Sequence, residues 1–131
     1  MNIADPTSLD QFRQVGKHLR QGGTIITGID RPLPNPTHRP RFFGRPAALS
    51  THYVQIAAWA HAPIVVIAAF ARRNGTLQVE TSEPIEMDSC PDRETETLCN
   101  AEKVLAVAEG FILRAPTQWS MTWPVWPAIK K

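Results

Sequence analysis

The first periodic run of apolar residues lies near the N-terminus. Apolar side chains recur at spacings of three and four between positions 9 and 19, and Ser8 with Gln11 forms a capping-box pattern before them. This pattern predicts an amphipathic helix over residues 8–21. The pair Gly22-Gly23 follows and is expected to end it.

The next segments change character within a few residues. Residues 24–28 are a β-branched run that ends in glycine, which predicts a short strand. Residues 29–41 hold so many prolines that neither a helix nor a central strand can form there. We therefore expect a long, semi-rigid loop.

The most apolar stretch, residues 54–70, contains no formally charged side chain. It is at the lower length limit for crossing a bilayer and contains Gln55, His61 and a central Pro63, so a transmembrane helix is not expected. The preferred division is a buried helix over 48–61, with His61 as a core histidine, followed by a fully buried strand over 64–70.

Asn74-Gly75 comes next, between two strand-like runs, and is a strong hairpin signal. It predicts that residues 76–81 pair antiparallel with the preceding strand, as a β-hairpin near 64–81. Three-four spacing of apolar residues from Asp92 onward predicts a helix of about twenty residues that stops before Pro116. Its acids are assigned to the region near its start, where they suit the helix dipole. The tail after this helix holds three of the four tryptophans, which we expect to close the core or to contact a membrane interface.

Composition is that of one folded domain, because 131 residues with 43% apolar and 20% charged side chains suffice for a single core. The expected class is α/β, with a mixed sheet and flanking helices, over residues 1–131. The twelve prolines cluster in two regions that are expected to be loops.

The net charge of +2 is unevenly distributed along the chain. Residues 11–45 carry a net charge of +6, and residues 80–109 carry −7. A basic surface for a phosphate-bearing ligand, an acidic protein or a membrane would explain this. Two solvated faces that attract each other would explain it equally well.

Standard catalytic and metal-binding patterns are not found. Neither the two cysteines nor the four histidines have the spacing of metal ligands, and no metal or cofactor is expected. Because no secretory signal opens the chain, we expect a reducing, cytoplasmic environment. A nucleic-acid role is not favoured, since no reader motif accompanies the basic residues.

The segment 28–46, GIDRPLPNPTHRPRFFGRP, is the most informative for function. It combines arginine forks, which match phosphate or carboxylate oxygens, with two adjacent phenylalanines and a glycine. A ligand with an anionic head and an apolar tail would suit it. The alternative is that Phe42 and Phe43 are core residues of a short strand and that the arginines are solvated. The candidate substrate-binding residues are Asp30, Arg31, His38, Arg41, Phe42, Phe43, Gly44 and Arg45.

Five segments, in order, also resemble one known family. They are LRQGG at 19–23, GIDRP with FFGRPA at 28–47, APIVV at 62–66, EPIE at 83–86 and PTQW at 116–119. They are similar to motifs of the bacterial lipid A biosynthesis acyltransferases and the related phosphatidylinositol mannoside acyltransferases. The family's acidic and basic positions in its third block fall on Asp30 and Arg31. The family's P-x-G-P turn is replaced here by residues 48–52.

The resemblance implies a glycerol-phosphate-acyltransferase-like α/β sandwich and acyl transfer from acyl carrier protein or acyl-CoA to a glycolipid hydroxyl at the cytoplasmic membrane face. That family's catalytic histidine lies in a His-x-x-x-x-Asp/Glu motif. None of the four histidines here has an acid five residues later. The resemblance therefore implies the C-terminal half of such an enzyme, without a catalytic residue of its own.

The partners implied are the acyl donor, an anionic glycolipid and a peripheral contact with the inner membrane. A homodimer or pairing with an N-terminal half is also expected, because a half-sheet would expose an unpaired edge. The rival hypothesis is a non-catalytic module that binds lipid headgroups or a protein.

Overall fold

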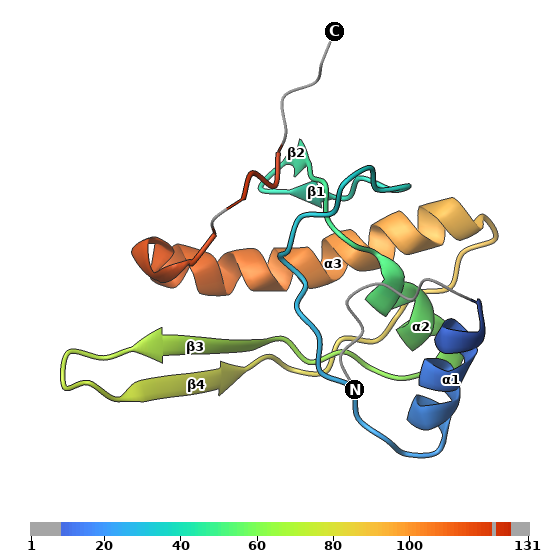
Figure 1. Cartoon of the computed structure of the whole chain (residues 1–131), viewed down its shortest axis with the longest axis horizontal. Coiled ribbons are helices and arrows are strands. Elements are labelled where there is room, and N and C mark those ends of the chain that lie inside the picture. Colours follow the sequence, from blue (N-terminus) through green and yellow to red (C-terminus); the bar gives the residue numbers. More distant parts are fainter. Residues whose placement is uncertain (1–8, 122, 127–131) are drawn as a thin grey trace, which may run out of the picture.

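The structure is a computed structural model that describes residues 9–121 and 123–126 (Figure 1). Its elements are α1 (Leu9–Arg20), β1 (Arg41–Phe42), β2 (Arg45–Pro46), α2 (His52–Ala60), β3 (Ile67–Ala71), β4 (Leu77–Thr81), α3 (Arg93–Arg114) and the 3-10 turn η1 (Pro116–Gln118). The predicted combination of helices and strands is confirmed. Among the described residues the strands form two separate antiparallel pairs, β1-β2 and β3-β4, and not the mixed sheet expected from the sequence.

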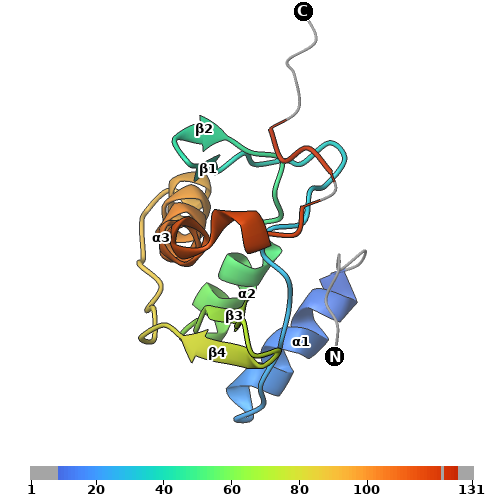
Figure 2. The ribbon, with the colours of Figure 1, turned by 90° about the vertical axis from the view of Figure 1, so that its left-hand side faces the viewer.

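Helix α3 is the centre of the molecule. Figures 1 and 2 show it between the β1-β2 hairpin on one side and the β3-β4 hairpin on the other. Val104 and Leu105 are both fully buried but belong to different apolar clusters, because neighbouring helix positions point about 100° apart. Val104 packs with Val54 of α2, and Leu105 packs with Phe42 of β1. The long predicted helix is confirmed, and it organises two cores instead of one.

Asp92 begins α3 as its N-cap. Its carboxylate accepts a hydrogen bond from the main-chain N–H of Thr95 at 3.0 Å and another from the Thr95 hydroxyl at 2.6 Å. These bonds stabilise the charged form and lower the pKa of Asp92. They also satisfy one of the N–H groups that the first turn of a helix leaves without an intrahelical partner.

Helix α1 packs against α2. Gly16 lies directly against the Trp59 ring, so closely that a Cβ at this position would overlap it. The Arg20 guanidinium lies 3.6 Å from the centre of the same ring and donates to the Trp59 carbonyl at 2.8 Å. The predicted helix near the N-terminus is confirmed over its described residues. No helix in the described part of the chain is long and apolar enough to cross a membrane.

Two predicted strands differ in the structure. The strand predicted over 24–28 is wrong, since this segment has no strand pairing and Ile26 is 76% exposed. A β-branched run favours extended backbone, but an extended segment becomes a strand only where another backbone lies beside it. The second strand starts at Ile67 and its residues are alternately exposed, so full burial over 64–70 is also wrong.

The helix predicted over 48–61 starts later, at His52. The backbone of Ala48 is used in long-range pairing instead, because it accepts from the Leu33 N–H and donates to the Val125 carbonyl, both at 2.8 Å. His61 is the exposed C-cap of α2, with a positive φ of 54°, so its prediction as a core histidine is wrong.

The predicted hairpin near 64–81 is confirmed as β3-β4. The Gly75 N–H donates to the Arg72 carbonyl at 3.1 Å, and Gly75 has a φ of +83°. This matches a type I turn followed by a left-handed glycine, a common three-residue hairpin connection. One face of the hairpin packs toward α3, where the Phe70 and Phe111 rings are 6.3 Å apart.

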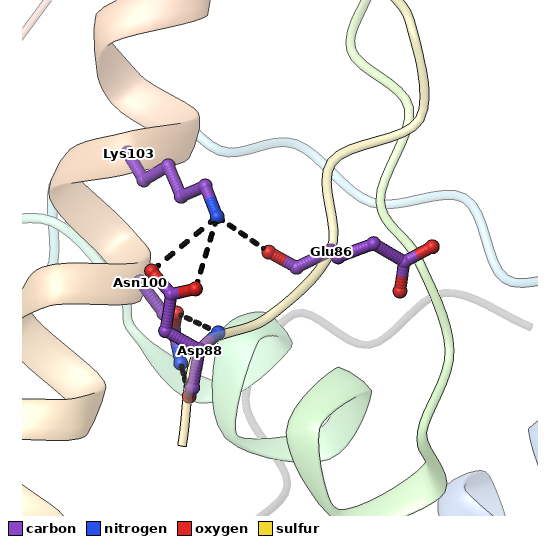
Figure 3. Close-up of polar contacts among 4 residues, drawn as sticks. All are labelled: Glu86, Asp88, Asn100 and Lys103. Atoms are coloured by element: carbon purple, nitrogen blue, oxygen red, sulfur yellow. Dashed lines mark hydrogen bonds and ion pairs between the residues drawn. The ribbon is translucent and has the colours of Figure 1, made fainter. Parts of the chain in front are cut away.

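A loop from residue 82 to 92 returns the chain to α3. Figure 3 shows Asn100 and Lys103 reaching from α3 to this loop. The buried Asn100 amide accepts from the Asp88 N–H at 2.8 Å and donates to the Asp88 carbonyl at 3.0 Å. Lys103 Nζ donates to the Glu86 carbonyl at 2.8 Å and pairs with the Asp88 carboxylate at 3.3 Å. Lys103 therefore neutralises part of the negative charge of residues 80–109 from within that same segment.

Candidate functional site

The β1-β2 hairpin carries the predicted FFG segment at its tip. Arg41 pairs with Pro46 and Phe42 with Arg45, which leaves Phe43 and Gly44 as a two-residue turn. Both turn residues have positive φ, 52° at Phe43 and 76° at Gly44, as a type I′ turn requires. Glycine adopts this conformation freely, whereas a bulky residue such as Phe43 does so only under constraint.

Two carboxylates on α3 provide that constraint. The Phe43 N–H donates to Glu109 Oε1 at 2.6 Å, and the Arg41 N–H donates to Glu102 Oε1 at 2.9 Å. Glu102 and Glu109 are seven residues apart, which places them on one face of the helix. The assignment of the helix's acids to its start missed both of them. Their spacing along the exposed side of the predicted helix was the available signal.

An aromatic cluster anchors the other side of the hairpin. The Phe42 ring is 0% exposed and lies 5.6 Å from Trp126 and 5.7 Å from Trp119, measured between ring centres. Trp126 Nε1 donates to the Phe42 carbonyl at 2.9 Å. Phe43 is half-buried, 6.3 Å from Trp119. Phe42 is thus a core residue of a short strand, so the structure does not leave it available to a ligand's apolar tail.

The arginines of the hairpin face the solvent. Arg41 and Arg45 are both exposed. Arg41 Nη1 donates to the Gly44 carbonyl at 3.0 Å, across the turn, and the Arg45 guanidinium lies 5.7 Å from the Trp126 ring centre. Arg31 is exposed as well. A guanidinium held against the turn or an aromatic ring loses less freedom on binding an oxyanion than a freely moving one.

Asp30 is joined to the C-terminal segment. Its carboxylate Oδ2 accepts from Trp119 Nε1 at 2.9 Å, between residues 89 positions apart in the sequence. On the next residue back, the Gln118 amide accepts from the Ala71 N–H at 2.8 Å and donates to the Ala71 carbonyl at 3.2 Å. The segment 116–119 therefore connects Asp30, at the start of the loop 29–41, to Ala71 at the end of β3.

His38 lies in a different place from the hairpin arginines. It lines a cavity of about 400 Å³ between the proline-rich loop 33–38 and the segment 49–55. None of the predicted arginines lines this cavity. The predicted site is therefore divided into the arginine hairpin, the Asp30–Trp119 contact and the His38 cavity.

The structure places both cysteines and the other side chains that could bind a metal. Both cysteines are free, and burial raises the pKa of the Cys90 thiol, with Cys99 and Glu96 raising it further. A raised pKa disfavours the thiolate that would act as a nucleophile. Within the described residues, no three His, Cys, Asp or Glu side chains are grouped closely enough to hold a metal ion.

No model of a known protein family matches this chain, and a search of curated proteins also returned no match. The resemblance to lipid acyltransferases therefore rests on the sequence motifs alone.

Proposed function

We propose that this chain is the substrate-binding portion of a lipid acyltransferase-like enzyme and that its arginine hairpin, residues 41–46, binds phosphate groups of an anionic glycolipid. The single observation that carries the proposal is the convergence of the motif segments in space. Asp30 of GIDRP bonds to Trp119 of PTQW, and Trp119 packs on the phenylalanines of FFG. Ile64 of APIVV pairs with Ile85 of EPIE through two hydrogen bonds of 2.8 and 2.9 Å.

Motif residues scattered over about 90 positions would not need to meet if each resemblance were accidental. Instead they meet in two groups that pack on α3, one around Trp119 and one at the Ile64–Ile85 bridge. In this arrangement Asp30 positions Trp119, and Trp119 with Trp126 supports the hairpin that carries Arg41 and Arg45. The chain's own residues bind and orient an anionic substrate. Within the proposal, acyl-ACP or acyl-CoA supplies the acyl group, and a general base for the acceptor hydroxyl comes from another segment or chain.

The exposed face of β3-β4 supports pairing with such a partner. The three directly opposed pairs on this face are Ile67 with Thr81, Ala69 with Val79 and Ala71 with Leu77. They include no charged side chain, and Ile67 and Val79 are 58% and 63% exposed. Isolated two-stranded sheets are at best marginally stable in water, so further strands or a second layer over this face would complete the proposed acyltransferase-like sandwich.

The second candidate function is a non-catalytic module for lipid headgroups. Burial of Phe42 favours it, because the hairpin then offers its arginines but lacks the apolar surface that an acyl chain would need. The two candidates share the anion-binding hairpin. They differ in whether the chain contributes to acyl transfer when a partner supplies the missing base.

The test is binding to lipid vesicles measured by co-sedimentation. Wild-type protein is expected to bind vesicles rich in anionic phospholipid and to bind neutral phosphatidylcholine vesicles much more weakly, with the difference shrinking at high salt. Arg41→Ala with Arg45→Ala should weaken binding to anionic vesicles about thirtyfold, since each of the two basic residues near such a surface contributes about 1 kcal/mol.

The matched control is Arg13→Ala with Arg73→Ala, which removes the same charge from exposed positions on α1 and on the β3-β4 turn. If the hairpin variant and this control bind alike, general charge and not the hairpin drives binding, and the proposed role of the hairpin is rejected.

A further inference from the structure

The cavity beside His38 is a second place in the molecule with groups suited to a ligand. Its volume of about 400 Å³ lies within the range of small-molecule pockets. His38 approaches it from the proline-rich loop, and His52, the first residue of α2, approaches it from the opposite wall. We propose that this cavity binds a phosphate monoester, and the proposal does not depend on the function assigned to the arginine hairpin.

The walls of the cavity are tied together before any ligand arrives. Pro32 and Leu49 form an antiparallel bridge, and the Leu33 N–H donates to the Ala48 carbonyl at 2.8 Å. Pro34 and Pro36 restrict the loop between this bridge and His38. A binding site whose walls are already ordered loses less conformational entropy on binding.

Two hydroxyl groups, of Ser50 and Thr51, lie at the start of α2 and line the cavity. Thr51 is only 5% exposed and lines the cavity, and its Oγ1 accepts from the Gln55 amide at 3.4 Å. The Ser50 hydroxyl oxygen accepts from the His52 main-chain N–H at 3.3 Å and lies 3.4 Å from His52 Nδ1. The Thr51 hydroxyl oxygen already accepts from Gln55, so its O–H hydrogen is left to donate, and it has no acceptor among the described residues.

The ligand must therefore supply acceptor atoms. No carboxylate is found among the described residues that line the cavity, while two imidazoles, two hydroxyls at the α2 end and a Gln55 amide are. The wall formed by residues 33–38 belongs to the segment 11–45, whose net charge of +6 attracts anions. A phosphate group offers several acceptor oxygens in one place, and the remaining volume accommodates the organic group to which it is esterified.

The experiment measures binding of inorganic phosphate and of glycerol 2-phosphate to the full chain by isothermal titration calorimetry. His38→Asn and Thr51→Val are the two test variants. Each should weaken phosphate binding about tenfold to a hundredfold, the effect of losing one hydrogen bond to a charged group. Thr51→Val keeps the side-chain shape and lies in a wall that the Pro32–Leu49 bridge already holds, so it keeps the measurement interpretable if His38→Asn unfolds.

The matched control is His18→Asn with His61→Asn, which changes the two histidines that do not line the cavity. This variant should bind phosphate as the wild type does. A third arm uses vesicles containing phosphatidic acid, to separate a lipid phosphate from a soluble ester. Binding to these vesicles that is lost in Thr51→Val, with no response to free phosphate, assigns the cavity to a lipid phosphate.

The proposal is overturned if wild-type protein binds none of the three probes, or if the test variants bind them as tightly as the control. Arg41→Ala with Arg45→Ala separates this outcome from failure of the hairpin proposal. Titrations of His38→Asn and Thr51→Val in that background exclude phosphate bound by the hairpin and measure the cavity alone, because neither arginine lines it.

Discussion

Phe43 and Tyr53 each carry an energetic cost. For Phe43 the cost is a positive φ, and for Tyr53 it is a buried hydroxyl. Phe43 has a positive φ, but its N–H reaches Glu109 and its ring contacts Trp119 and Trp126. Tyr53 packs against the apolar cluster on α3, and its hydroxyl has no hydrogen-bond partner among the described residues. Strain at Phe43 is balanced by contacts at the candidate site, whereas the buried hydroxyl of Tyr53 is uncompensated.

Tyr53→Phe is therefore expected to stabilise the protein. Removing an unpaired buried hydroxyl should raise the free energy of unfolding by about 1 kcal/mol, which corresponds to a rise in Tm of about 3–5 °C. Thermal unfolding followed by circular dichroism measures it. A lower Tm would contradict the unpaired state of the buried hydroxyl.

The same residue gives a spectroscopic check, because Tyr53 is the chain's only tyrosine. Burial raises the pKa of its hydroxyl far above the ordinary value near 10, since the phenolate would have to form in an apolar environment. Phenolate absorbance should consequently appear only when alkaline pH unfolds the protein. Ionisation of the native protein at pH 10 would contradict the buried position.

At the level of elements, α1 and α3 use glycine for different reasons. Gly16 allows α1 to approach the Trp59 ring of α2, whereas Gly110 of α3 has no neighbouring atom within 4 Å of the place where a Cβ would lie. Both glycines are in helix interiors, where alanine is intrinsically preferred. Comparing alanine substitutions at the two positions therefore separates the effect of helix propensity on stability from the effect of helix packing.

Gly16→Ala should destabilise the docking of α1, and Gly110→Ala should stabilise α3. We expect overpacking against Trp59 to cost about 1–3 kcal/mol in the first variant, less the gain in helix propensity. The second variant should gain about 0.5–1 kcal/mol. Hydrogen exchange resolved by residue measures both, with faster exchange in α1 expected only for Gly16→Ala. Equal protection of α1 in both variants would show that Trp59 moves aside without cost.

At the scale of the whole molecule, the β3-β4 hairpin has one apolar face that no other described element covers. Its α3 side is fixed by the Phe70–Phe111 contact and by an ion pair between Arg114 and Glu80. Its opposite side presents Ile67, Leu77 and Val79 to the surroundings. Apolar side chains without a cover are a recognised sign of an interaction surface.

Leu77→Lys with Val79→Lys tests that surface. These charges should abolish concentration-dependent self-association in sedimentation velocity, while the Tm of the monomer changes little because both side chains are already exposed. Gln14→Lys with Ser89→Lys, at exposed positions outside this hairpin, is the control for added charge. A wild type that stays monomeric and binds no added partner would contradict this interpretation of the face.

The sequence by itself determined the features that depend on local patterns. The apolar periodicity of α1 and α3 predicts which face of each helix is buried. The pair Asn74-Gly75 predicts a turn that needs a left-handed glycine. These signals involve residues a few positions apart, so they do not require knowledge of the rest of the chain. For the segment 28–46 the sequence left two alternatives open. The structure has exposed hairpin arginines and a buried Phe42, as the second alternative states.

Only the tertiary structure decided which distant groups meet. Whether residues 24–28 become a strand depends on a neighbouring backbone, and none lies beside them in the described structure. Asp30 and Trp119, Phe43 and Glu109, and the two walls of the His38 cavity are each brought together by packing on α3 or by loop pairing. Such contacts are decided by the balance of burial and hydrogen bonding over the whole chain, because no local pattern determines which of many distant partners a side chain will reach.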